Sequence, residues 1–133
     1  MTQRWLLLLA SCITIFFCAA VQAEVKTGKV SEFEWESAGQ KHTAHIFVPK
    51  DLGDEEVPLV VTFHGSRRRG HQIVTRWQKM AEEEKIIVVG PNSINSVGWA
   101  MPDDSPEPIY DLVEELKNLY PVNPQRVYLM GHS

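Results

Sequence analysis

Residues 122–133, VNPQRVYLMGHS, are the stretch of this 133-residue chain that decides its fold. An Asn-Pro pair at 123–124 indicates a turn, and the apolar run of 126–130 predicts a short strand after it. The strand leads directly into Gly131-His132-Ser133. Small residues around a serine at the end of a strand are typical of a tight turn that lifts the hydroxyl above a sheet. We therefore expect strand, turn and exposed serine in this order.

Two further apolar runs, at 58–64 and 86–89, are rich in β-branched residues, and all three runs predict strands buried on both faces. Apolar residues at helical spacing predict two helices, the second capped by Asp104. The expected elements are strands at 28–36, 41–48, 58–64, 86–89 and 126–130 and helices at 71–84 and 104–120. The first two strands would form a hairpin. The alternation that follows predicts an α/β fold, with a mostly parallel sheet and helices on its faces.

A second motif, His64-Gly65-Ser66, follows the strand of 58–64. Glycine lets the backbone turn toward a ligand, so N–H groups in this loop could donate to an oxygen that develops negative charge. We expect His64 itself to be a structural hydrogen-bonding residue rather than a catalytic one.

Together these segments resemble the N-terminal half of an α/β-hydrolase. More narrowly, they resemble the secreted esterase group that includes poly(3-hydroxybutyrate) depolymerase-like and feruloyl esterase-like proteins. The resemblance covers nearly all of 24–133 and rests on 58–66, 89–92, Gly98-Trp99 and 122–133. It implies that Ser133 is the nucleophile of a Gly-x-Ser-x-Gly elbow and that Gly65 and Ser66 supply the oxyanion-hole backbone. The triple arginine at 67–69 departs from the small, glycine-rich loop expected there.

The resemblance also implies a serine esterase-type enzyme that hydrolyses small-molecule or polymeric carboxylic esters. In this fold the acid and the histidine base follow the serine in the chain, whereas all five histidines here, at 42, 45, 64, 71 and 132, precede Ser133. We therefore expect residues 24–133 to be a partial domain that ends at the elbow and is inactive alone. The alternative is a short secreted, non-catalytic α/β domain that binds a ligand or a partner.

Two features beside the motif allow more than one interpretation. Trp99 lies on a loop that leaves the carboxyl end of a strand, so it is a candidate for the substrate pocket and equally for a packing residue at its rim. The arginines at 67–69 could bind an anionic group near the oxyanion loop, but such a run is more often a solvated loop tip.

Residues 1–23 predict a secretory signal peptide. Arg4 precedes an almost wholly apolar run of 16 residues from Trp5 to Ala20, and Val21-Gln22-Ala23 provides a cleavage site. The run is shorter than the roughly 20 residues that span a bilayer, so no stable membrane span is expected after cleavage. The protein is therefore expected to be secreted or periplasmic, with an uncleaved anchor or a lipid attached at Cys12 as minor alternatives.

Removing 23 of 133 residues leaves 110, which is enough for one modest core. Both cysteines, Cys12 and Cys18, would leave with the signal peptide, which excludes disulfides and a cysteine metal site. Without Arg4, the 13 basic residues fall to 12 against 17 acidic ones, so nucleic-acid binding is not expected. The sequence has no phosphate-binding glycine motif, and neither a cofactor nor a metal is expected.

Overall fold

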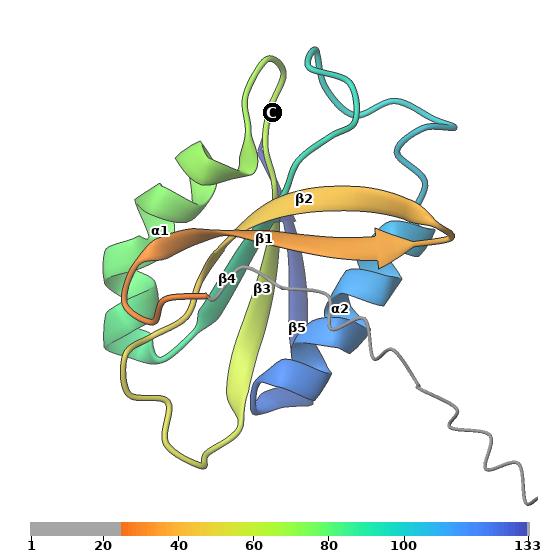
Figure 1. The fold of residues 1–133 in the computed structure, drawn as a ribbon. Helices are drawn as coiled ribbons and strands as arrows, with labels where there is room; N and C mark the ends of the chain where they lie inside the picture. Colours follow the sequence, from red (N-terminus) through yellow and green to blue (C-terminus); the bar gives the residue numbers. More distant parts are fainter. Residues whose placement is uncertain (1–24, 133) are drawn as a thin grey trace, which may run out of the picture.

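The computed structural model describes residues 25–132, which form one five-stranded sheet with a helix on each face (Figure 1). The expected signal peptide, Cys12 and Ser133 lie outside the described residues. The elements, in chain order, are β1 (Val30–Ser37), β2 (Gln40–Phe47), β3 (Val57–Phe63), α1 (Gly70–Glu84), β4 (Ile87–Pro91), α2 (Glu107–Leu119) and β5 (Val122–Gly131). The predicted α/β class, with its leading hairpin, is confirmed.

The strands lie in the order β1-β2-β4-β3-β5. The hairpin strand β2 pairs antiparallel with β4, whereas β3 pairs parallel with both β4 and β5. Parallel neighbours need crossover connections, and α1 and α2 provide them. Figure 1 shows α1 and α2 on opposite sides of the sheet, so both faces of the central strands are covered.

Side chains that alternate along the central strands build two cores, one on each face. Val61 and Val89 point into the core beneath α2, and Val60 and Val88 into the core beneath α1. Burying a valine of this kind contributes about 1.5 to 3 kcal/mol relative to leaving it exposed. Because residues 57–62 of β3 are all buried, this strand has no polar face, as its unbroken apolar sequence predicts.

β5 differs from its predicted form. It begins at Val122 rather than 126, because Val122 pairs with Val57 and extends the ladder past an irregularity. It was also expected to be buried on both faces, and this is wrong for the described chain. β5 is the outer strand of the sheet, and Tyr128 and Leu129 are 53% and 66% exposed.

α2 begins three residues later than the sequence predicts, at Glu107, and Asp104 does not cap it. The Asp104 carboxylate instead accepts hydrogen bonds from the backbone N–H groups of Ile94, at 2.9 Å, and Ala100, at 2.8 Å. The side chain that was expected to begin the helix therefore closes the loop before it. Neither described helix is long and apolar enough to cross a membrane.

The first turn of α1 lies directly against β4 through two glycines. A Cβ atom on Gly90 would lie 2.9 Å from the Cα of Gly70 and 2.8 Å from Cγ2 of Val74, and a Cβ on Gly70 would overlap the carbonyl of Gly90. Beside this contact, the Asn92 side chain accepts the Gly70 N–H at 2.8 Å. Two backbones without side chains between them therefore set how closely α1 approaches the sheet.

Replacing Gly90 by alanine should destabilise the protein by about 3 kcal/mol, the upper part of the usual range for overpacking, because the backbone of α1 would have to move. The free energy of unfolding from urea titration of the whole protein measures this. Thr75→Ala, at an exposed position of the same helix, is the control and should change stability by less than about 0.5 kcal/mol. Equal effects of the two substitutions would contradict the role assigned to the glycine contact.

Candidate active site

Three loops meet where the parallel strands end. The backbone N–H of His132, after β5, donates to the carbonyl of Phe63 in β3 at 3.0 Å. The loop after β4 is tied to the loop after β3 by a bond from the Arg67 N–H to the Val97 carbonyl at 2.9 Å. The carboxyl ends of parallel strands are where ligands bind in open α/β sheets. The structure therefore brings the two sequence motifs together at this edge.

His64 is a structural residue, as expected. Its side chain is buried, Nε2 accepts the backbone N–H of Ser93 at 3.1 Å, and Nδ1 lies 2.9 Å from the carbonyl of Gly65. The neutral ring with its proton on Nδ1 satisfies both contacts. Because both nitrogens are occupied, His64 holds the two loops together and has no nitrogen left for proton transfer to a substrate.

Gly65 and Ser66 begin a tight turn, in which the N–H of Arg68 donates to the carbonyl of Gly65 at 3.2 Å. Arg67 has a φ of 56°, a left-handed conformation that usually favours glycine. The hydroxyl of Ser66 donates to the carbonyl of Val97 at 3.0 Å and helps to hold the turn. Arg67 therefore takes a conformation that glycine favours, although the arginine run departs from the glycine-rich loop that was expected there. Within residues 25–132, no acceptor takes the backbone N–H of Gly65 or Ser66.

Trp99 packs beside this turn. Its Nε1 donates to the carbonyl of His64 at 2.9 Å, and its ring centroid lies 4.9 Å from that of His64 and 5.1 Å from that of Phe63. Trp99 also lines one end of an open cavity of about 520 Å³. Trp99 thus has the packing contacts of a rim residue, and it also lines a cavity.

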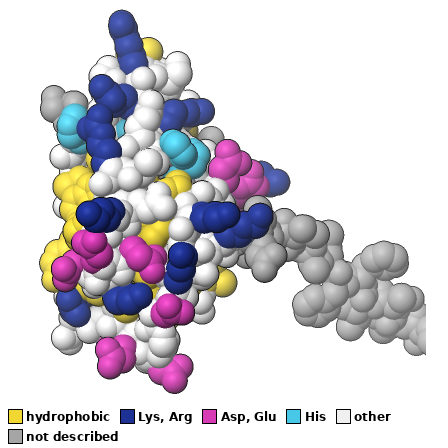
Figure 2. Space-filling model, turned by 90° about the vertical axis from the view of Figure 1, so that its left-hand side faces the viewer, with side chains coloured by type: hydrophobic (Ala, Val, Ile, Leu, Met, Phe, Trp, Pro, Cys, Tyr) yellow, Lys and Arg dark blue, Asp and Glu magenta, His cyan; other side chains and the backbone are white. Residues whose placement is uncertain are grey.

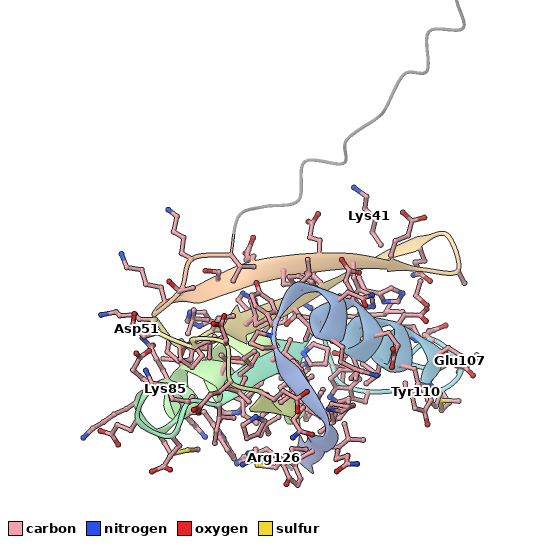
Figure 3. All side chains as sticks on the ribbon, turned by 90° about the horizontal axis from the view of Figure 1, so that it is seen from below. Lys41, Asp51, Lys85, Glu107, Tyr110 and Arg126 are labelled. Carbon is pink, nitrogen blue, oxygen red and sulfur yellow. The ribbon has the colours of Figure 1, made fainter. Side chains whose placement is uncertain are left out.

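The cavity runs from Trp99 along the space between α2 and the uncovered face of β5. Its walls are mostly apolar, with Ile109 and Val113 from α2 and Val127 and Leu129 from β5. Tyr110, which is 71% exposed, also lines the cavity, and Figure 3 shows it on α2 near Glu107.

Asn92 is a residue of the site region whose role the sequence did not reveal. Besides accepting the Gly70 N–H, its side chain donates to the hydroxyl of Thr43 at 3.0 Å, and its backbone N–H donates to the carbonyl of the same threonine at 2.8 Å. It therefore joins β2, the end of β4 and the start of α1. An asparagine directly after a strand that ends in Gly-Pro was the available signal.

His42, His45 and His71 make their ring and ion-pair contacts away from His132. The ring of His42 stacks on Trp35 with centroids 5.2 Å apart, and His45 meets His71 edge to face at 5.3 Å. Nε2 of His45 lies 3.9 Å from the carboxylate of Glu32, and its buried Nδ1 has no hydrogen-bond partner among the described residues. No group of three potential metal ligands occurs within residues 25–132.

Burial lowers the pKa of His45 below its ordinary value of 6.5. The neighbouring His71 and Arg69 lower this pKa further, and Glu32 opposes them. These groups come from α1, from the loop before it and from β1. The neutral ring is therefore the form that suits the folded protein.

The order of the five strands and the helices on both faces of the sheet match the α/β-hydrolase fold. The chain superposes on an S-formylglutathione hydrolase from Agrobacterium tumefaciens with a TM-score of 0.63, at 17% identity over 78% of this chain and 48% of that one. It superposes on LpqC, a poly(3-hydroxybutyrate) depolymerase from Bordetella parapertussis, with a TM-score of 0.63, at 18% identity over 79% and 43% of the two chains. The predicted resemblance to α/β-hydrolases is confirmed at the level of the fold.

One curated protein is similar in sequence, the bifunctional acetylxylan esterase/xylanase XynS20E of Neocallimastix patriciarum. It is 25% identical over 99 residues, which are 71% of this chain and 15% of that protein. No family model matches the chain. The chain thus spans less than half of the two solved structures above and a small part of the bifunctional protein.

The lowered pKa of His45 predicts a pH-dependent stability. A histidine whose folded-state pKa is depressed contributes stability above its unfolded pKa, near 6.5, and this contribution is lost as the pH falls through the folded value. Urea midpoints of the whole protein at pH 7.5 and 5.5 should therefore differ less in His45→Gln than in the wild type. His71→Gln, which removes one cause of the shift, should give an intermediate difference. Identical pH slopes for all three proteins would contradict this assignment.

Proposed function

We propose that the chain is the N-terminal part of a serine hydrolase that acts on carboxylic esters, with Ser133 as nucleophile. The observation that carries the proposal is the bond from the His132 N–H to Phe63, because it sets the residue before Ser133 against the strand that leads into Gly65 and Ser66. The esterase and hydrolase names of the similar proteins support it.

In the proposed reaction, the Ser133 hydroxyl attacks the ester carbonyl while a histidine takes its proton. The carbonyl oxygen becomes an oxyanion. It would accept hydrogen bonds from the backbone N–H groups of Gly65 and Ser66, which have no acceptor among residues 25–132. One such donor is typically worth about 10²- to 10³-fold in rate. The histidine and its acid would come from sequence that follows Ser133, so residues 24–133 alone would be inactive.

We propose that the end of the cavity at Trp99 takes part of the substrate. The ring is fixed by its bond to His64 and lies beside the oxyanion turn, where it could pack against an acyl or aromatic group. The other end has a different role, because the exposed face of β5 is apolar and such faces are normally covered in a folded protein. Later parts of the protein would cover Leu129 and leave the space near Trp99 open.

We also propose that the enzyme is exported from the cell that makes it. The sequence of residues 1–23 supports export through a cleaved signal peptide, and the enzyme would then work outside the cell or in a periplasm. Amino-terminal sequencing of the protein purified from its producing cells tests this, with Glu24 expected as the first residue.

The nucleophile can be tested with a fluorophosphonate probe on the full-length gene product. The wild type should be labelled and should hydrolyse 4-nitrophenyl acetate. Ser133→Ala should lose the label and roughly 10⁴-fold or more of kcat, because an alkoxide can no longer form. The exposed Ser96→Ala is the matched control and should keep both properties. Labelling that survives Ser133→Ala would refute the assignment, and a folded protein with neither label nor activity would favour the non-catalytic binding domain.

A further inference from the structure

Four arginines gather at the same edge as the elbow. Arg67, Arg68 and Arg69 lie in the turn after β3, and Arg76 lies two helical turns further on in α1. All four are exposed. The ion pairs of the described residues involve only lysines and histidines, so none of these arginines has a carboxylate partner within residues 25–132. A group of like charges without counter-charges is unusual in a chain whose net charge is −4.

Three of the arginines surround one hollow. Arg68, Arg69 and Arg76 line it together with Gly65 of the oxyanion turn and His132, the residue before Ser133. Gln72 and Ile73 line the same hollow, and Arg76 follows them by four and three residues, which places it on the same face of α1. The arginine hollow, as we call it, thus combines the turn after β3 and the first part of α1 with His132, the residue before the proposed nucleophile.

The field at the hollow is positive for a second reason. α1 has no acidic residue in its first turn, whereas its acidic residues are Glu82, Glu83 and Glu84 at the far end. The amino-terminal end of a helix carries a partial positive charge, which here adds to the guanidinium groups. Figure 2 shows the α1 side of the molecule, where Lys and Arg lie over the whole height but most Asp and Glu lie in the lower part, so the upper part is predominantly basic.

The hollow is small. Its open volume is about 10 Å³, which is room for a single atom of water size and not for an acyl chain. A ligand would therefore place one charged oxygen in it and leave the rest of its structure outside. A carboxylate oxygen accepts charge-assisted hydrogen bonds from guanidinium groups, so the arginines around the hollow could hold the one oxygen that enters it.

We propose that the arginine hollow binds a carboxylate carried by the ester substrate, so that the preferred substrates are acidic esters with a free carboxylate near the scissile bond. This rests on the proposed function, because it assigns the substrate class of the same site. The backbone at Gly65 would then contact the reacting carbonyl while the arginines hold the second, charged end of the molecule. The hollow selects the substrate and takes no part in bond making.

The test compares monomethyl succinate with its methyl ester, dimethyl succinate, on the full-length protein, with hydrolysis followed as acid release at constant pH. One carboxylate is free in the first ester and blocked in the second. The wild type should prefer the acidic ester by about 10-fold or more in kcat/KM, and 0.5 M NaCl should reduce this preference. Arg76→Gln and Arg68→Gln should each lower the preference about 5-fold or more, because kcat/KM should fall much more for the acidic ester than for the neutral one. Lys79→Gln makes the same charge change at a side chain of α1 that is 89% exposed, and it should have no effect.

A wild type without preference, or a preference that survives both arginine substitutions, would overturn the proposal while ester hydrolysis itself still stood. Calorimetric titration of Ser133→Ala with monomethyl succinate separates the two proposals further, because it needs no turnover. Binding that Arg76→Gln abolishes would support the arginine hollow even if neither ester were hydrolysed, and absence of binding would overturn it. The unfolding midpoints of the variants should match the wild type, since the substituted side chains are exposed.

Discussion

The contact between Gly70 and Gly90 is the constraint on which the rest of the structure depends. It lets the first turn of α1 lie on the backbone of β4, and the chain between β3 and α1 then has only six residues, 64–69, in which to turn. That short segment carries the oxyanion candidates and three of the four arginines, those at 67–69. A wider spacing between helix and sheet would move the whole turn away from His132.

Hydrogen bonds from the loop after β4 complete this arrangement. His64, Asn92 and Trp99 each bond to a backbone group of a different segment, and these bonds join the loop after β3, the loop after β4 and the start of α1. These bonds fix the backbone before a substrate binds. That matters for a site whose donors are backbone N–H groups, because the direction of an N–H group depends on the conformation of the chain. The polar residues of the region thus act mainly on the backbone.

The sequence predicted the strands and helices of the central layer well, because apolar periodicity reports burial directly. It failed where a distant partner decided the outcome. Asp104 could cap a helix or close the loop before it. The N–H groups of Ile94 and Ala100, to which it bonds, come near it only in the folded loop. The grouping of Arg76 with Arg68 was equally hidden, since it depends on where α1 lies relative to the turn. His64 was predicted correctly because its position before a glycine already restricts it.

The order of the strands also determines how the sheet can grow as the chain is made. β3 is synthesised before β4 but lies beyond it in the sheet, so β2 and β3 have no shared ladder until β4 enters between them. The β1–β2 hairpin can form early from local contacts, whereas joining it to the parallel strands must wait for about forty further residues. β4 is therefore the strand whose arrival joins the β1–β2 hairpin to β3, and slow synthesis before it would prolong the exposure of both.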